Sequence, residues 1–463
     1  MLLHLTSLPS PHGSGDLGPE AHAFADRLAE AGCSVWQMLP IGPIGAGDSP
    51  YSSPSSFAIE PTYLALAPLV QDGLLHVSDL RLPAARARRL GTGDCDFDGS
   101  RAFRMPLYAK AAAAFAARLA RRPADARALA AFEARAGWLP AWLDFIAGRD
   151  PAARRTHGWI QFALARQWAA LRAHCRSRGV SLVGDVPIFV TADSADVRAN
   201  PELFRLRKDG SPEVLTGVPP DGFSADGQLW GHPHYEWRAH ARDGFRWWIS
   251  RIACAAERFD LVRIDHFIGF TQAYEVPAGA ANARRGSWRA APGRALLAAM
   301  AKAFPSLPLI AEDLGALTPE VEALRDEFGL AGMRIVQNAF WSGESGDMPH
   351  RHPQCAVAYS GTHDNETTKQ WWRGRDRAQR ARFRAYAGDG PVHRAMARIV
   401  LASPANLAIL PMQDLLGLGA KARMNLPGTP TGNWRWRMER NAFSAALVRR
   451  LGELVEASGR RAR

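Results

Sequence analysis

Acidic side chains directly follow short apolar runs in this sequence, and they are the residues that could carry chemistry. The clearest case is Phe259-Asp-Leu-Val-Arg-Ile-Asp-His-Phe267, where the run ends abruptly in Asp265 and His266. Side chains alternate between the two faces of a strand, so Arg263 and Asp265 point the same way. A buried carboxylate needs a cation or hydrogen bonds to stay ionised, and Arg263 is placed to supply the cation. Taken alone, this stretch fits a structural ion pair equally well.

The same pattern occurs at three more places. An apolar run ends in Asp185, in Glu312-Asp313 and in His363-Asp364. A single aspartate after a strand is usually a helix N-cap. Four such stretches in one chain, two of them with a histidine beside the acid, make a purely structural account poor. Glycoside cleavage uses such a set, because a retaining enzyme needs a carboxylate nucleophile and a carboxylic acid about 5–5.5 Å apart.

Flat aromatic side chains are a second requirement of a sugar site. The chain has 15 tryptophans. Several lie outside the apparent core pattern, and these are Trp230, Trp371, Trp372, Trp434 and Trp436. They fit sugar-stacking positions, although ordinary core or subunit contacts explain several of them as well.

Strands and helices alternate along the chain in a way that brings the acids together. Short β-rich runs are separated by longer helical patterns, which indicates an α/β fold with a parallel sheet. Eight runs are predicted as strands, the number that closes a (β/α)8 TIM barrel. They are residues 2–5, 34–38, 181–184, 261–264, 308–311, 333–336, 356–359 and 407–410. Because the carboxyl ends of barrel strands share one rim, we expect the acids to meet there.

Helical periodicity fills most of the gaps between these strands, and two gaps are long. The predicted helices are residues 20–31, 104–121, 160–178, 235–259 and 293–304, with a further start at Thr318-Pro319. We expect a single catalytic domain over residues 1–463. Residues 50–175 are predicted to form a largely helical insertion after the second strand. Residues 186–234 are predicted to form a lid after the third, because loops of that size in a compact fold are usually functional.

Composition argues against several other classes of function. The 463 residues are 47% hydrophobic and 22% charged, and no apolar run reaches the roughly 18 residues of a membrane span. The net charge of +12 comes mainly from arginines that are dispersed except at residues 82–89 and 460–463. No recognition motif accompanies them, so nucleic acid is not an expected partner. The five cysteines lack paired or metal-ligand spacing and no signal peptide is visible, so we expect reduced thiols in the cytoplasm.

The strand-end blocks resemble those of a known family. Four blocks are similar to those of the 4-α-glucanotransferases: Gly184-Asp-Val-Pro-Ile-Phe-Val190, Val262-Arg-Ile-Asp-His-Phe267, Ala311-Glu-Asp-Leu-Gly315 and Gly361-Thr-His-Asp-Asn365. These enzymes, also called amylomaltases or disproportionating enzymes, form glycoside hydrolase family 77 and are related to the α-amylase superfamily. Further similar blocks are residues 5–13, 47–54, 227–231, 411–417 and 423–428. The resemblance extends over nearly the whole chain.

The resemblance implies a role for each acid. Asp265 would be the nucleophile, Glu312 the general acid/base, and Asp364 the carboxylate that stabilises the transition state by binding sugar hydroxyls. Arg263 would keep Asp265 ionised, which agrees with its place on the strand. The implied sugar contacts are Tyr51, Asp185, Gln228, Trp230, Arg263, His266 and His363. Neither a metal nor an organic cofactor is implied.

The implied reaction moves a segment of an α-1,4-glucan to the 4-hydroxyl of another glucan or of glucose, so maltooligosaccharides are the expected ligands. Glu312 has to be protonated near neutral pH, and we expect burial beside the other acids to raise its pKa. Two alternatives stay open. One is an α-1,4-glucan hydrolase with the same carboxylates, and the other is a non-catalytic glucan-binding protein.

Two departures from the family pattern bear on specificity. Gly222 follows Pro219-Pro-Asp where an aromatic residue is usual, so one aromatic arm of the lid is missing. Ala46 stands where Tyr or His is common, which puts a secondary glucan site near it in doubt. Neither residue is one of the three acids. We therefore expect them to affect chain-length preference and the ratio of transfer to hydrolysis.

Overall fold

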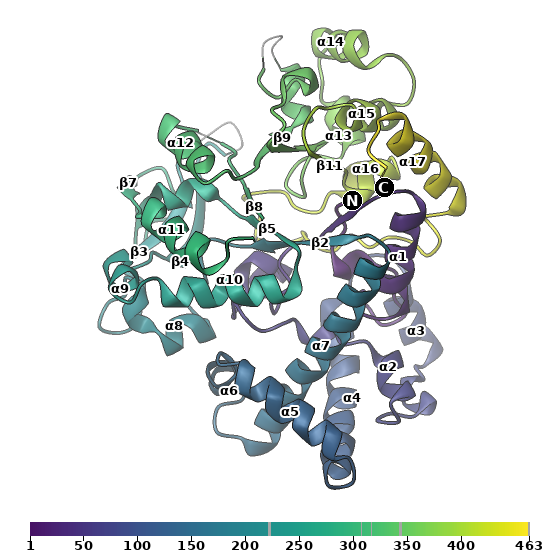
Figure 1. The fold of residues 1–463 in the computed structure, drawn as a ribbon, viewed down its shortest axis with the longest axis vertical. Coiled ribbons are helices and arrows are strands. Elements are labelled where there is room, and N and C mark those ends of the chain that lie inside the picture. The colour runs from purple at the N-terminus through teal and green to yellow at the C-terminus, as the bar shows by residue number, and fades with distance from the viewer. Residues whose placement is uncertain (221–223, 307, 316, 342–344, 462–463) are drawn as a thin grey trace.

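A ring of parallel strands lies at the centre of the computed structural model, which describes residues 1–220, 224–306, 308–315, 317–341 and 345–461 (Figure 1). Four strands pair in the order β1-β2-β5-β8 and three in the order β11-β10-β9. Their bounds are β1 (Val35–Gln37), β2 (Ser181–Val186), β5 (Leu261–Ile264), β8 (Leu309–Ala311), β9 (Gly332–Ile335), β10 (Ala356–Tyr359) and β11 (Leu407–Ile409). All of these pairs are parallel.

Single bridges close the ring between the two sheets. On one side, the Ala311 N–H donates to the Ala331 carbonyl at 2.8 Å. On the other, Leu2 pairs in parallel with both Gln37 and Pro411, and its N–H donates to the Leu410 carbonyl at 2.8 Å. The predicted TIM barrel is confirmed, and its strands lie at or within a few residues of the predicted positions.

The first predicted strand, residues 2–5, is wrong in extent. Pairing is confined to Leu2 and Leu3, and residues Leu5–Ser7 form a 3-10 turn closed by the Leu8 N–H on the Leu5 carbonyl. The apolar residues of this run are buried as a strand would be, so the sequence pattern detects burial. It does not detect that the chain leaves the sheet and turns directly after Leu2 and Leu3 have paired.

Helices surround the barrel, and those predicted from residues 20, 293 and 319 begin within one residue of these positions. The helices predicted from residues 104 and 160 begin earlier, at Phe97 and Pro151, and the helices from Thr368 onward were not predicted. The helices around the barrel are α1 (Pro19–Glu30), α7 (Pro151–Ser177), α9 (Trp237–Arg242), α10 (Arg246–Arg258), α11 (Gly293–Ala303), α12 (Pro319–Glu327), α13 (Thr368–Arg373), α14 (Arg377–Ala387), α15 (Val392–Leu401), α16 (Met412–Leu415) and α17 (Ala445–Ala457). The single helix predicted over residues 235–259 is wrong, because it is broken into α9 and α10. Gly244 and Phe245 both have positive φ at the break, a conformation that ends a helix.

Residues 50–175 contain a helical subdomain below the barrel in Figure 1. It holds α2 (Leu66–Gln71), α3 (Ala84–Gly91), α4 (Phe97–Arg118), α5 (Pro123–Arg135), α6 (Leu139–Ala147) and most of α7. The buried Arg104 side chain anchors α4 to the N-terminal segment, since it donates to the Ser14 carbonyl at 3.0 Å and pairs with Asp16 at 2.9 Å.

A second, antiparallel sheet lies beside the barrel, and the sequence did not predict it. Its order is β4-β3-β6-β7, with β3 (Val214–Val218), β4 (Gln228–Pro233), β6 (Gln272–Pro277) and β7 (Ser287–Ala290). Residues 186–234 also contain the short helix α8 (Ala195–Ala199). The strands escaped sequence reasoning because glycines interrupt β3 and β4 and half-exposed residues hide the alternation. Gly222, the departure singled out above, lies outside the described residues.

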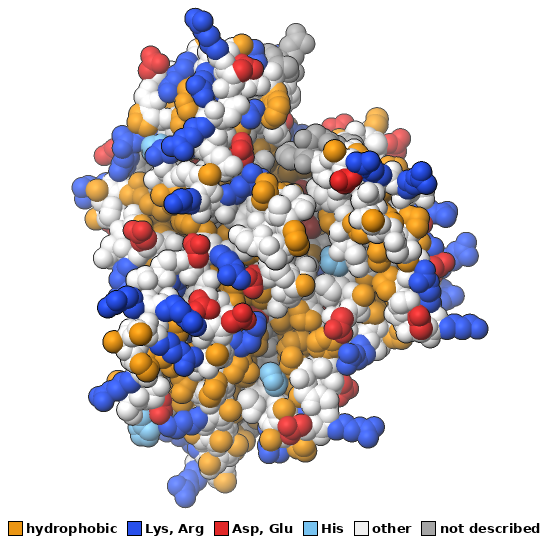
Figure 2. Space-filling model, turned by 180° about the vertical axis from the view of Figure 1, so that it is seen from behind, with side chains coloured by type: hydrophobic (Ala, Val, Ile, Leu, Met, Phe, Trp, Pro, Cys, Tyr) orange, Lys and Arg blue, Asp and Glu red, His pale blue; other side chains and the backbone are white. Residues whose placement is uncertain are grey.

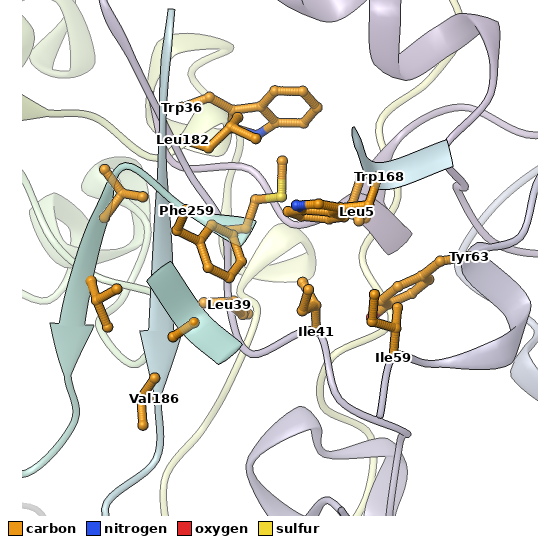
Figure 3. Packing of buried hydrophobic residues seen from close by; sticks show 14 of the residues in the cluster. Leu5, Trp36, Leu39, Ile41, Ile59, Tyr63, Trp168, Leu182, Val186 and Phe259 are labelled. Atoms are coloured by element: carbon orange, nitrogen blue, oxygen red, sulfur yellow. The ribbon is translucent and has the colours of Figure 1, made fainter. Parts of the chain in front are cut away.

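Apolar side chains pack the barrel interior and the space between strands and helices (Figure 3). Trp36 is buried and its Nε1–H donates to the Leu3 carbonyl at 2.8 Å, which ties β1 to the first barrel segment. A Cβ added to Gly184 would lie 2.2 Å from the Phe259 ring, so the close packing of β2 there requires glycine. A second apolar cluster, which includes Phe340, Trp371 and Phe383, fills the space under α13–α15.

Within the described ranges, no helix is both long enough and apolar enough to cross a membrane.

Candidate active site

The Arg263 guanidinium is the centre of the candidate site. Its side chain is only 1% exposed and contacts carboxylates from three strand ends. Nη1 donates to Asp185 Oδ2 at 2.5 Å and to Asp265 Oδ1 at 3.1 Å, and Nη2 lies 2.9 Å from Glu312 Oε1. The register of β2, β5 and β8 places these residues side by side, since Arg263 pairs with both Asp185 and Ile310. The sequence expectation that Arg263 and Asp265 share a face is confirmed.

Asp265 and Glu312 are in direct contact. Both contact the Arg263 guanidinium, and a hydrogen bond between their carboxyl groups raises the pKa of Asp265 and lowers that of Glu312. The backbone N–H of His266 donates to Glu312 Oε2 at 2.6 Å, and His266 has a φ of 47°, an unusual value for a residue other than glycine. An inverting glycosidase needs carboxyl groups about 6.5–9.5 Å apart with a water between them, and two carboxyl groups that interact directly do not fit that arrangement.

The protonation of this pair reverses the expectation from sequence. Burial and then the charge of Glu312 raise the pKa of Asp265 well above its usual value. Burial also opposes ionisation of Glu312, but the Arg263 guanidinium and the His266 N–H outweigh it and lower the pKa of Glu312. Without sugar, the two carboxyls therefore titrate as a coupled pair, in which ionisation of one opposes ionisation of the other. The expected rise in the pKa of Glu312 is wrong for this state, because two donors stabilise its charged form.

Asp364 stands on the other side of the site, after β10. Asn425 Nδ2 donates to its Oδ1 at 2.6 Å, and His363 Nε2 lies 3.4 Å from its Oδ2. The Arg423 guanidinium donates to the Asp364 carbonyl at 2.6 Å. The carboxylate is 38% exposed, so it is held in place yet open to a ligand.

Three aromatic rings connect the two sides of the site. Tyr51 donates its hydroxyl to Asp185 Oδ2 at 2.8 Å and stacks on the His363 ring at 5.3 Å with an interplanar angle of 18°. Trp434 packs against both, 5.6 Å from Tyr51 and 5.8 Å from His363. Trp434 has a φ of 68°, which is a strained conformation for a bulky side chain.

Strand β4 of the second sheet supplies the remaining wall. The Trp230 ring meets the His266 ring edge-on at 4.7 Å, and Trp230 Nε1 donates to Gln228 Oε1 at 3.3 Å. Phe189 packs against Trp230 at 6.2 Å. Burial lowers the pKa of His266 to about 4, so its ring is neutral at pH 7. Its Nε2 is buried and lacks a hydrogen-bond partner in the described part of the chain, which leaves it for a ligand.

The structure thus joins all ten residues that the sequence singled out, through the contacts above. Sequence reasoning assigned no role to Asn425 or Phe189, and it named Trp434 only among five tryptophans that could stack on sugars. Asn425 lies in a block that carried the resemblance, but nothing in that block indicated its function. Trp434 is 7% exposed and lies beside Tyr51 and His363. Trp371 and Trp436 are also buried, which favours the core interpretation for those two.

Among the described residues, no group of three or more His, Cys, Asp and Glu side chains has the arrangement of a metal site. The acids of the site are instead paired with Arg263, Asn425 and backbone N–H groups. The arrangement can place a nucleophile and an acid on opposite sides of a scissile bond, with neutral polar groups and aromatic faces around the sugar.

Comparisons with known proteins agree with this chemistry. Residues 3–155 and 148–442 match the family described as 4-alpha-glucanotransferase. A 4-alpha-glucanotransferase of Thermus thermophilus is 41% identical over 491 residues, covering 99% of this chain and 98% of that protein. One of Synechocystis sp. is 41% identical over 498 residues, covering 100% of this chain and 97% of that protein.

Solved structures give the same result. An amylomaltase from Streptococcus agalactiae, in complex with acarbose, matches with a TM-score of 0.93 at 32% identity and covers 100% of this chain and 99% of that chain. The amylomaltase of Corynebacterium glutamicum, at 17% identity, shares the fold with a TM-score of 0.81 over 98% of this chain and 74% of that chain. This chain is an enzyme that belongs to the 4-α-glucanotransferase family, glycoside hydrolase family 77.

Proposed function

We propose that Asp265, Glu312 and Asp364 transfer α-1,4-glucan segments by double displacement, with maltooligosaccharides as donors and acceptors. Asp265 attacks the anomeric carbon, the glycosidic C–O bond breaks, and Glu312 gives its proton to the departing 4-oxygen. The 4-hydroxyl of an acceptor then attacks the same carbon. Its proton passes to Glu312 while the bond to Asp265 breaks, so each step balances and the anomeric configuration is retained.

The single observation that carries this proposal is the contact of Arg263 with three carboxylates, two of which share a hydrogen bond. A pair that holds one proton already contains an acid and a base. When a sugar ring enters between Asp265 and Glu312, it breaks their hydrogen bond and removes water from both. The proton then moves from Asp265 to Glu312, because Asp265 keeps the cation Arg263 and Glu312 meets the leaving oxygen.

The sugar in the cleaved subsite would contact groups that are buried and unpaired. Asp185 Oδ1 and His266 Nε2 are of this kind among the described residues, and both lie beside the reacting carboxyls. Asp364 would bind hydroxyls of the same ring and favour its distortion. Tyr51, Gln228, Trp230 and His363 would hold the ring through hydrogen bonds and stacking. No cofactor has a part in these steps.

Transfer requires an acceptor to reach the intermediate before water does. The wall formed by β4, with Trp230 over His266, would exclude water on one side of the site. We further place the reaction in the cytoplasm, since the five cysteines are free thiols in this structure.

Incubation with maltotriose alone tests the proposal. We expect glucose together with a ladder of longer maltooligosaccharides, resolved by length. Maltose and glucose without longer products would show that water wins, and the enzyme would then act as a hydrolase. An Asp265→Asn variant is the matched control, because it should keep glucan affinity and lose turnover. If the wild type binds maltotriose but changes neither it nor longer glucans, the catalytic proposal fails.

A further inference from the structure

Most of the surplus positive charge of this protein lies in one short segment. Residues 368–398 contain nine basic and two acidic residues, so this segment carries a surplus of seven out of the net charge of +12. Six of the nine are arginines between Trp372 and Tyr386. Arginines were expected to be dispersed outside residues 82–89 and 460–463, and this segment departs from that expectation. The segment forms α13, α14 and α15, which lie at the upper end of the molecule in Figure 1.

These basic side chains are not neutralised. In the described part of the chain, none of the nine has an acidic group within 4.0 Å, whereas Arg263, Arg325 and many others do. The only nearby helix-capping acid, Asp376, bonds to the Gln379 N–H at 2.7 Å instead. Arg373, Arg377 and Arg380 are exposed. Figure 2 shows blue side chains over this end of the surface.

Aromatic rings hold several of the guanidinium groups flat. Arg375 lies 4.5 Å from the centre of the Trp341 ring and 5.6 Å from that of Trp371. Arg380 and Arg384 lie 5.4 and 4.8 Å from the Trp372 ring. Part of each guanidinium edge already donates to backbone carbonyls: Arg375 to Trp371, Arg380 to Trp372 and Arg373, and Arg384 to Gly388 and Gly390. The remaining N–H groups lie at the edge of a planar fork that matches the oxygens of a phosphate group.

The segment is continuous with the catalytic rim. Helix α13 begins at Thr368, four residues after Asp364, and Trp341 follows directly after the 3-10 turn Val336–Phe340 that extends β9. The Arg382 guanidinium donates to the Trp341 carbonyl at 2.9 Å and so joins the two connections. Both connections leave the carboxyl ends of barrel strands, which is the end that carries the catalytic acids. Trp341 is 60% exposed and offers a flat apolar face at this place.

We propose that this arginine face, defined as Trp341 and the six arginines from Arg373 to Arg384, binds phosphate monoesters carried on an α-glucan chain. The partner class rests on the proposed function, because a glucan held in the cleft would extend toward a surface built on the same rim. The exposed Trp341 ring stacks a glucose unit, and the neighbouring guanidinium edges bind a phosphate on the chain. The face thereby favours phosphorylated polymers over neutral ones.

Charge alone also fits nucleic acid, but two observations favour the glucan. The first is that the arginine face begins four residues after Asp364, in the connection that follows β10. The second is that the family of this chain acts on glucans rather than on nucleic acids. The stacked arginines are grouped around three tryptophans within α13 and the Trp341 connection, so the face is compact. A single phosphate-bearing sugar segment fits such a site without an extended track of contacts.

The test compares binding of the full-length protein to phosphorylated amylopectin and to the same polymer after phosphatase treatment, at about 0.1 M salt. We expect dephosphorylation to weaken binding at least tenfold. An Arg373→Glu/Arg377→Glu variant should lose the same preference. An Arg121→Glu/Arg127→Glu variant is the matched control, since these two arginines are equally exposed and have no ion pair in the described residues, and it should stay within twofold of wild type.

The outcomes separate this proposal from the proposed function. Maltotriose turnover is measured on every variant and should stay within twofold, since none of the substitutions is in the site. Equal binding of both polymers, or equal losses in the two variants, would overturn the arginine face as a phosphate site. Tighter binding of a 20-nucleotide single strand than of the phosphorylated polymer would assign the face to nucleic acid instead. Loss of maltotriose turnover in the wild type would concern the catalytic proposal alone.

Discussion

Glu312 and Asp313 are adjacent in the chain, yet their carboxyl groups belong to two differently balanced clusters. Around Glu312, the single cation Arg263 serves Asp185, Asp265 and Glu312. Around Asp313, two cations contact one oxygen, because Arg325 and Arg334 both reach its Oδ2, and Arg325 also pairs with Asp326 at 2.8 Å. The Met333 N–H donates to the other Asp313 oxygen at 2.6 Å. The first cluster has three acids for one arginine, whereas the second has two acids for two arginines.

The comparison shows that the ratio of acids to cations decides whether carboxyls at one strand end are reactive or stabilise the fold. Asp185 is buried and Asp265 and Glu312 are partly buried beside one guanidinium, so burial and mutual repulsion oppose ionisation of all three and favour a proton that can be transferred. The Asp313 carboxylate is fully buried and bonded at both oxygens, so it fixes the end of β8 against β9. The reactive cluster is the incompletely compensated one.

Among the substitutions that test this comparison, that of Arg263 should have the largest effect. An Arg263→Gln variant leaves its three acids without a cation, so Asp265 can no longer ionise when sugar binds. We expect kcat/KM for maltotriose to fall on the order of 10⁴-fold, or roughly 5 kcal/mol of transition-state stabilisation. An Arg325→Gln variant is the control, and its activity per folded molecule should stay within about tenfold of wild type. Similar losses in both variants would remove the distinction between the clusters.

Asp313→Asn should affect stability rather than chemistry. The variant removes the acid that pairs with Arg334 and leaves Arg325 with Asp326 alone, and breaking such a cluster typically costs about 3–5 kcal/mol of unfolding free energy. Urea unfolding measures this loss. An unchanged midpoint would mean that the carboxylate contributes little to holding β8 against β9.

Asp265→Asn should raise stability at neutral pH. The pKa of Asp265 is raised in the folded state, so the folded protein binds this proton more tightly than the unfolded chain does. Wild-type stability is therefore lost as the pH rises above the unfolded value of about 4. The variant lacks this penalty, and we expect a gain of about 1–2 kcal/mol at pH 7 that vanishes below about pH 4. A thermal unfolding series in pH measures it, and a gain that persists at low pH would contradict the assignment.

The smallest effect is expected at Trp434, which contacts Tyr51 and His363 rather than the catalytic acids. Trp434→Phe keeps an aromatic ring but loses part of the contact with Tyr51 and His363. We expect KM for maltotriose to rise about five- to tenfold with kcat nearly unchanged, an effect of about 1 kcal/mol on ground-state and transition-state binding alike. Trp436→Phe serves as the control and should leave KM unchanged. A fall in kcat alone would mean that Trp434 positions the reacting groups.

The contrast also separates what the sequence could predict from what it could not. The strands and the acids at their ends were predictable, because apolar runs that stop at Asp265, Glu312 and Asp364 are local signals. The lowered pKa of Glu312 was not predictable, since it depends on Arg263 and the His266 N–H, which reach Glu312 from another strand. The second sheet was not predicted for the same reason, because its other two strands, β6 and β7, come after the barrel strand β5 in the sequence.

The pairing of Leu2 with Pro411 has a consequence for how this protein is made. The two segments are separated by about 400 residues, yet the Leu2 N–H donates to the Leu410 carbonyl. This bond closes the barrel that positions the catalytic acids. During synthesis, the segment around Leu2 remains an open edge until residues near 410 leave the ribosome. Pairing over such a long sequence separation is slow and leaves apolar edges exposed. We therefore expect spontaneous refolding after dilution from denaturant to be slow, and its yield to fall as protein concentration rises.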